Sequence, residues 1–318
     1  MTTGTSNFES LTIAFYNIEN LFDIYDDKRT NDNDFLPTSD KRWTQKRYDR
    51  KIYKLGAVIS KIGFNVTGQP PAIIGLAEVE NKKVIQDLLE SEDLKEYHYK
   101  YVHFDSNDER GIDVALLYND DLFKVLSSEI FTVLLEDDDG NRDFTRDILL
   151  VSGSLNGEDI HVVVNHWPSR REGEKESAPK RFESAKKANE VLVKLHDNHS
   201  DPKVIVMGDF NDNPNDESVK FLTNEQSLFN PMETLFSYEE GSLNHKFKWN
   251  LFDQIMITTN FFETKKDACK FDEAHIFGDK FLTQYNGKFE GHPYRTYVGK
   301  KYKGGFSDHF PVFIILKW

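Results

Sequence analysis

Short runs of hydrophobic residues recur along the whole chain, separated by more polar stretches. The runs are rich in β-branched side chains and hold few polar residues, which favours strands that are buried, several of them on both faces. They occupy residues 11–16, 72–77, 114–118, 148–152, 160–165, 203–208, 254–258 and 311–316. The chain is therefore expected to have a core made largely of β-sheet.

Helical periodicity appears between these runs, with hydrophobic residues three and four positions apart. One helix is expected after Thr44, and another after Asn81, whose side chain suits the position that caps a helix N-terminus. The hydrophobic helix faces comprise Ile52, Leu55, Val58, Ile59 and Ile62; Val84, Ile85, Leu88 and Leu89; and Ala185, Ala188, Leu192 and Leu195. Strands mixed with covering helices predict a layered α/β protein.

Composition and charge narrow the class of protein. Hydrophobic residues make up 38% of the 318 positions, which excludes a disordered chain. No apolar run is long enough to cross a bilayer, and the first residues do not form a secretory signal. Cys269 is the only cysteine, so the sequence favours a reducing, cytoplasmic location and leaves secretion of a trimmed chain as an alternative.

The sequence shows no internal repeat and no low-complexity linker. We therefore predict a tail over residues 1–9 and a single catalytic domain over residues 10–318, monomeric and without an obligate protein partner. The net charge of −14 argues against a protein that holds nucleic acid tightly without sequence preference. It is compatible with an enzyme that contacts phosphate through a metal ion.

Polar side chains stand at the ends of the predicted strands. Four of them follow a strand, and the others precede one. If the strands that begin with a polar residue run antiparallel to those that end with one, all of these residues meet at one edge of the sheets. Asn17, Glu78, His166 and Asp209 follow strands; Asp113, Asp253 and the pair Asp308 and His309 precede them. A polar strand end is unremarkable by itself, but this shared geometry predicts one site.

Carboxylates in this group suit a hard divalent cation. Glu78, Asp209 and Asp308 offer the oxygen ligands that Mg²⁺ prefers. The neutral side chains of Asn17 and Asn211 can hold a water or a phosphate oxygen without adding negative charge. We therefore expect a site for Mg²⁺ or Mn²⁺.

The histidines can transfer protons near neutral pH. We expect Asp253 and His309 to orient or activate the attacking water, and Asp113 and His166 to assist the leaving oxygen. Asp209 is an alternative acceptor of the proton. The sequence contains no zinc-ligand spacing, no phosphate-binding glycine loop and no serine nucleophile motif, so a metal-assisted attack of water on phosphorus is the favoured chemistry.

Six strings carry a resemblance to a known family: AFYNIEN, GLAEVEN, VVVNHWPSR, VMGDFNDNP, LFDQIMI and GGFSDHFPV. In this order they resemble the endonuclease/exonuclease/phosphatase superfamily over about residues 10–318. The resemblance implies a four-layer α/β sandwich like that of deoxyribonuclease I, in which two packed mixed sheets are flanked by helices. It also implies that Glu78 binds the metal, that Asp209 and Asn211 lie at the scissile phosphate, and that Asp253 pairs with His309.

The strings YNIENLFD and KWNLFDQI most resemble bacterial nucleases of this superfamily. His166 after its strand is similar to the deoxyribonuclease and sphingomyelinase members, and Arg146 resembles a phosphate-contacting arginine of deoxyribonucleases. Glu19 stands where abasic endonucleases have Asp, which makes it a candidate metal ligand.

Two basic segments bear on the substrate. The first, residues 41–54, is expected to be the solvated face of a helix. The second, residues 294–303, leads into the Ser-Asp-His motif and mixes aromatic rings with four cations, Arg295, Lys300, Lys301 and Lys303. Rings for bases and charges for phosphates favour a nucleic-acid substrate, DNA or RNA. A small-molecule or lipid-headgroup phosphate, cleaved by a phosphodiesterase or a phosphatase, is the alternative.

Overall fold

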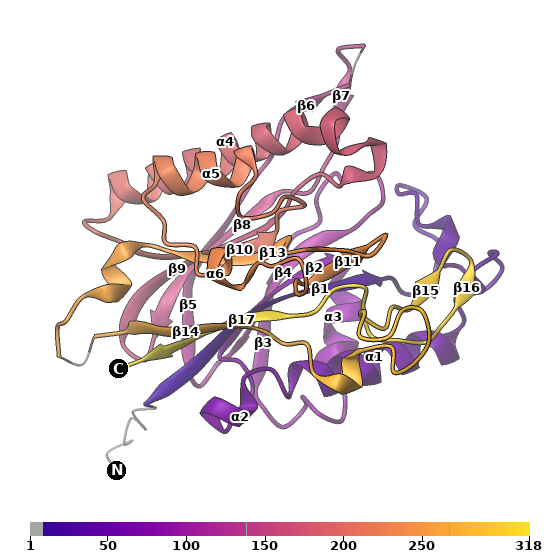
Figure 1. The fold of residues 1–318 in the computed structure, drawn as a ribbon, viewed down its shortest axis with the longest axis horizontal. Coiled ribbons are helices and arrows are strands. Elements are labelled where there is room, and N and C mark those ends of the chain that lie inside the picture. Colours follow the sequence, from indigo (N-terminus) through magenta and orange to yellow (C-terminus); the bar gives the residue numbers. More distant parts are fainter. Residues whose placement is uncertain (1–8, 138, 267) are drawn as a thin grey trace.

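A computed structural model describes residues 9–137, 139–266 and 268–318, and two β-sheets packed face to face form its centre (Figure 1). The six-stranded sheet has the order β14 (Lys270–Ile276), β17 (Val312–Lys317), β1 (Ser10–Leu21), β2 (Ile73–Val79), β4 (Asp113–Asn119) and β3 (Tyr99–His103). The five-stranded sheet has the order β13 (Asp253–Ile257), β10 (Lys203–Asp209), β9 (Glu158–His166), β8 (Ile148–Leu155) and β5 (Phe123–Phe131).

Helices cover the two outer faces (Figure 1). The six-stranded sheet carries α1 (Gln45–Ile59) and α3 (Lys82–Leu89), and the five-stranded sheet carries α4 (Glu174–Asn198) and α5 (Glu217–Glu225). Shorter elements are α2 (Phe64–Thr67), α6 (Met232–Leu235) and the hairpins β6 (Leu135–Glu136)–β7 (Arg142–Asp143), β11 (Leu243–His245)–β12 (Lys248–Asn250) and β15 (Tyr297–Val298)–β16 (Lys301–Tyr302). The predicted four-layer α/β sandwich is confirmed.

Strand β1 shows how the sequence divides its side chains between the layers. Ile13 and Phe15 pack between the sheets, whereas Ala14 and Tyr16 pack against the helices, as the period of two requires. Gly75 marks a close approach of the two sheets, because a Cβ atom there would lie 2.6 Å from the sulfur of Met207.

The helix starts follow the sequence. Helix α1 begins directly after Thr44, and Asn81 caps α3 by accepting a hydrogen bond from the backbone N–H of Val84 at 3.1 Å. In the part of the chain that the structure describes, no helix combines the length and the apolar character needed to span a membrane.

Every predicted strand is present, but three strands of the two main sheets, and the short strands of the three hairpins, were not predicted. β3, β5 and β14 lie at sheet edges, where half-exposed and polar side chains hide the hydrophobic pattern. Strand β1 is also longer than expected. Asn17 lies inside it, before an irregularity in the pairing with β2, rather than after its end.

Strand directions place the candidate residues at one edge. β1 is parallel to β2 and antiparallel to β17, while β9 is parallel to β10 and β10 is antiparallel to β13. β4, antiparallel to β2, begins at the same edge, where Asp113 lies opposite Val79. The expected convergence of strand ends and strand beginnings is therefore what the structure shows.

Candidate active site

Asp209 lies at the centre of the site. Its Oδ2 atom accepts a hydrogen bond from Nδ2 of Asn17 at 2.9 Å, and it lies 3.8 Å from Nε2 of His166 and 4.0 Å from Nε2 of His309. Asp253 is opposite Asp209 in the strand register, and its Oδ2 lies 2.6 Å from Nδ1 of His309. The two sheets thus bring five of the predicted residues together.

The buried charges in this group shift one another's protonation. Burial raises the pKa of Asp209 to about 6, although the nearby His309 opposes the shift. Burial acts to lower the pKa of His309, but the carboxylate of Asp253 outweighs it and holds that pKa well above its usual value. Burial, with Arg146 and Arg110, keeps the pKa of His166 well below its usual value. At neutral pH the two histidines therefore differ in charge.

Left-handed backbone recurs at this edge. Glu19, Glu78 and Asn211 have φ values of 51°, 66° and 50°, which non-glycine residues adopt rarely. The side chain of Asn211 donates to the carbonyl of Trp167 at 3.0 Å, and its backbone N–H donates to Oδ1 of Asp209 at 2.9 Å. Two hydrogen bonds thus hold Asn211 beside Asp209.

Three further carboxylates, those of Glu19, Glu78 and Asp308, belong to the six-stranded sheet. Glu19 accepts a hydrogen bond from the backbone N–H of Thr296 at 2.6 Å, and the guanidinium of Arg295 bonds to Asp308 and lies 3.7 Å from Glu19. Burial, together with the charge of Asp308, raises the pKa of Glu19 to about 7. Burial acts to raise the pKa of Asp308, but Arg295 keeps it below its usual value.

The donor set fits a hard divalent cation. Its atoms are carboxylate and amide oxygens, and the raised pKa of Glu19 marks a buried negative charge that an added cation would stabilise. The ligand atoms of Asp209, Asp253 and His309 lie within 4.8 Å of one another. Glu78 stands apart from that group, with Oε2 accepting from the backbone N–H of Asn20 at 2.7 Å.

Lys51 is a site residue that the sequence reasoning missed. It is buried, and its ammonium donates to Oγ1 of Thr296 at 2.7 Å and to the carbonyl of Phe306 at 2.5 Å. Burial lowers its pKa to about 8, while Glu19 opposes that shift. Lys51 lies three positions after the buried Tyr48 in α1, so the two side chains share one face of the helix. This spacing is the sequence signal that could have identified Lys51 as an inward-facing residue.

Arginines supply positive charge beside His166. Arg146 is buried and donates to Asp108 at 3.1 Å and to the carbonyl of Trp167 at 2.7 Å. Arg110, which the sequence reasoning did not single out, bonds to Asn20 and lies 3.8 Å from Glu78. Much of the hydrogen-bonding capacity of Arg146 is therefore used within the protein.

The expected pairing of Asp113 with His166 is corrected by the structure. Oδ2 of Asp113 lies 3.3 Å from Nε2 of His103, whereas the carboxylate near His166 is that of Asp209. The reason is topological: β4 neighbours β3 in one sheet, and His166 ends β9 in the other sheet.

The basic segment before the Ser-Asp-His motif is partly neutralised. Arg295 pairs with Asp308, and Lys300 pairs with Asp40. Lys301 and Lys303 are exposed, and no ion pair holds either of them within the described residues. The first basic segment is only partly solvated, because Trp43 and Lys51 are buried in it.

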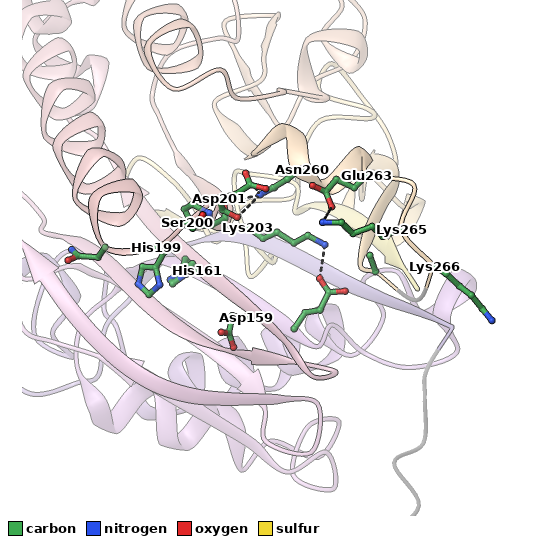
Figure 2. Close-up of a pocket in the computed structure, with 14 residues that line it drawn as sticks. Asp159, His161, His199, Ser200, Asp201, Lys203, Asn260, Glu263, Lys265 and Lys266 are labelled. Carbon is green, nitrogen blue, oxygen red and sulfur yellow. Dashed lines mark hydrogen bonds and ion pairs between the residues drawn. The ribbon is translucent and has the colours of Figure 1, made fainter.

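A cavity of about 750 Å³ lies away from these residues (Figure 2). It adjoins the beginnings of β9 and β10, the ends opposite to His166 and Asp209. Its charged side chains are largely paired with one another, as Lys203 with Glu158 and Lys265 with Glu263. This cavity therefore does not coincide with the candidate active site.

Comparison with known proteins agrees with the geometry. The sequence model of the Endonuclease/Exonuclease/phosphatase family matches residues 12–318, and the chain belongs to that family. Members are phosphoric ester hydrolases that typically use a divalent metal ion. A search of curated proteins gave no match.

Solved structures share the fold at low sequence identity. A mannosyl-6-phosphatase of Bacteroides thetaiotaomicron is 18% identical with a TM-score of 0.60, and the match covers 97% of this chain and 100% of the other. TDP2 of D. rerio, complexed with single strand DNA product, is 16% identical with a TM-score of 0.58, covering 97% and 99%. The human Nocturnin catalytic domain is 15% identical with a TM-score of 0.60, covering 97% and 94%.

Proposed function

We propose that this protein is a phosphodiester hydrolase that depends on Mg²⁺ or Mn²⁺ and acts on DNA or RNA. The observation that carries the proposal is the meeting of Asn17, His166 and His309 around one carboxylate, that of Asp209. Family membership over residues 12–318 supports hydrolysis of a phosphoric ester. Because both sheets contribute to the site, we also propose that residues 10–318 act as one catalytic domain.

Glu78, Asp308, Asn17 and Glu19 would hold the metal ion. When bound, the ion would neutralise negative charge on the phosphate as the transition state forms. Arg295 pairs with Asp308 and approaches Glu19, and Arg110 approaches Glu78. We expect Glu78 to be the main direct ligand, as the family resemblance implies. Lys51 would keep Thr296 in place beneath Glu19.

Asp209 is the proposed acceptor of the proton from the attacking water. Its pKa of about 6 is close to neutral pH, which suits a general base. His309, held by Asp253, has a raised pKa and would offer a charged N–H group to a phosphate oxygen. His166 is uncharged and would donate a hydrogen bond from its ring N–H to the leaving oxygen, which stabilises the charge that develops there, while Asn211 would hold a phosphate oxygen.

A nucleic-acid strand is the proposed substrate because cations flank the site. Arg146 and Arg110 lie near His166, and Lys301 and Lys303 are exposed on the segment that leads to Asp308. Similarity to TDP2, described as complexed with single strand DNA product, supports a polymer lying along these cations.

A small phosphate ester is the second candidate, and a specific observation favours it. Arg295 and Lys300 already form ion pairs within the protein, and the net charge is −14. Few cations are therefore left to contact the phosphates of a nucleic-acid strand. The fold similarity to a mannosyl-6-phosphatase is consistent with such a substrate.

An activity panel tests both candidates. Purified protein is assayed with Mg²⁺ on plasmid DNA, RNA, bis-p-nitrophenyl phosphate and sugar or inositol phosphates, with Asp209→Asn as the inactive control. Cleavage of DNA or RNA at low substrate concentration supports the nuclease. Turnover of monoesters alone supports the phosphatase. No turnover of any ester above that of Asp209→Asn contradicts both.

A further inference from the structure

A second cluster of potential metal ligands lies at the two ends of one loop. His103 is the last residue of β3, Asp105 follows two positions later, and Asp113 is the first residue of β4. One ligand atom from each of the three lies within 4.8 Å of the others. The loop between β3 and β4 is thus closed at its base by three residues that can bind a cation.

His103 is an unpartnered polar side chain that points into this cluster. Its side chain has 0% exposure, and within the described residues neither ring nitrogen has a hydrogen-bond partner. Such burial costs free energy unless another group satisfies the nitrogen. Nε2 lies 3.3 Å from Oδ2 of Asp113, without the alignment of a hydrogen bond.

The free oxygen of Asp113 is the one that faces His103. Its other oxygen, Oδ1, accepts a hydrogen bond from the backbone N–H of Ser106 at 3.0 Å, which fixes the carboxylate in place. Asp105 approaches the other ring nitrogen, with Oδ1 3.9 Å from Nδ1 of His103. The side chain of Asp105 is 68% exposed, so the cluster is open to solvent on that side.

These distances suit a shared ion. Ligand atoms bonded at about 2.0–2.2 Å to one zinc ion are roughly 3–3.5 Å apart. The 3.3 Å separation of His103 and Asp113 falls in that range, and the 3.9 Å separation of His103 and the exposed Asp105 is longer. We propose that His103, Asp105 and Asp113 bind a divalent transition-metal ion of the Zn²⁺ or Mn²⁺ type. The imidazole selects against Mg²⁺ and Ca²⁺, and the two carboxylates provide charge balance.

The acidic surroundings would concentrate cations at this position. Asp105 and Asp113 line a cavity of about 450 Å³ whose wall also includes Asp26, Asp27 and Glu80. This ion is distinct from the metal proposed at Glu78, and its binding does not depend on the proposed phosphodiesterase function.

The ion would brace a loop that reaches the active site. Asp108 of this loop accepts from Arg146 at 3.1 Å, and Arg110 of the same loop bonds to Asn20 and approaches Glu78. Closing the loop at its base would hold Asp108 and Arg110 in these contacts.

Zinc titration of the metal-stripped, full-length protein tests this site. Isothermal calorimetry measures Zn²⁺ binding, and thermal unfolding measures Tm with and without Zn²⁺. We expect Asp105→Asn to weaken one class of Zn²⁺ binding at least about tenfold, since even the loss of a supporting residue typically has that effect. The same variant should lose most of the Zn²⁺-dependent rise in Tm. His103→Gln should lose this class altogether, and if it fails to fold, Asp105→Asn still decides.

Asp121→Asn is the matched control. Asp121 is 66% exposed and lies 2.8 Å from Nδ1 of the exposed His98, so its removal changes the same charge at an ordinary surface pair. Unchanged Zn²⁺ binding in Asp105→Asn, or an equal loss in Asp121→Asn, overturns the proposal. Glu78→Gln separates the two sites: it should leave this class of Zn²⁺ binding intact even if the catalytic metal is lost.

Discussion

Asn17 and Asp209 come from different sheets, and the hydrogen bond between their side chains, 2.9 Å long, joins the two sheets at the edge where the site lies. The amide satisfies Oδ2 of a carboxylate that is only 2% exposed. It also favours the ionised form of Asp209, because hydrogen bonding to a carboxylate lowers its pKa. Asn17 is therefore positioned to set the pH at which Asp209 can accept a proton.

Asn17→Ala should move the acidic limb of the activity profile. Loss of the hydrogen bond raises the pKa of Asp209, so the base is protonated at a higher pH and the limb of kcat/KM shifts upward by about one pH unit. The measurement is kcat/KM against pH with bis-p-nitrophenyl phosphate. Asn198→Ala, at an exposed helix end, is the control and should leave the profile unchanged. An unshifted limb in Asn17→Ala would mean that Asp209 is not the titrating group.

His309→Ala and His166→Ala should each reduce kcat by about 10²–10⁴-fold, the usual range for a lost proton-transfer or charge-stabilising group. They should differ with an aryl leaving group, which is stable as an anion and needs little help from a hydrogen-bond donor. We expect that substrate to rescue His166→Ala and not His309→Ala. His98→Ala, an exposed histidine, is the control. Rescue of His309→Ala alone would exchange the two assignments.

Glu78→Gln should weaken Mg²⁺ binding and reduce activity together. The amide keeps the size of the side chain but removes the charge that holds the cation. Calorimetric titration of Mg²⁺ gives the affinity, and the same samples give kcat. Glu90→Gln, beyond the end of α3, provides the matched control. Equal affinity in the wild type and Glu78→Gln would remove Glu78 from the proposed metal site.

Replacing Lys301 and Lys303 by Gln should raise KM for DNA or RNA and leave bis-p-nitrophenyl phosphate almost unaffected. The dependence of binding on salt should become shallower by about 0.7–0.9 per lost phosphate contact. Lys265 and Lys266 lie at the cavity of Figure 2, so their double replacement makes the same charge change at the other edge. Equal losses on both substrates would indicate a structural role for Lys301 and Lys303.

His161 should make the fold sensitive to acid. Burial, with His199 beside it, lowers the pKa of His161 to about 4. The unfolded chain therefore binds this proton first, and the free energy of unfolding falls as pH drops from about 6.5 towards 4. In urea unfolding from pH 7 to pH 4, His161→Gln should lose less stability than the wild type. His98→Gln should behave like the wild type, and parallel curves for all three proteins would contradict this assignment.

Much of the site could be predicted because buried strands require runs of hydrophobic residues. A polar residue such as Asp209 at the end of a hydrophobic run stands out, and strand direction then groups it with Asp253 and His309. Side-chain partners could not be predicted in the same way. Asp113 lies next to His103 because β3 is the neighbour of β4, yet β3 is an edge strand with a weak hydrophobic pattern.

Lys51 shows a different limit. Its charge suggested solvent exposure, whereas carboxylates and carbonyls distant in sequence stabilise it in the interior. Such compensation exists only after the chain has folded. Helix periodicity alone contained the information that Lys51 faces inward.

The pairing of β1 with β17 bears on how the protein is made in the cell. β1 is the first described strand to leave the ribosome, and its antiparallel partner, with Asp308 and His309 just before it, is the last. Until then β1 has an unpaired edge, a state prone to misassembly during synthesis. We expect stalled nascent chains that end before residue 308 to show no hydrolysis of phosphoric esters, because Asp308, His309 and the antiparallel partner of β1 are then missing.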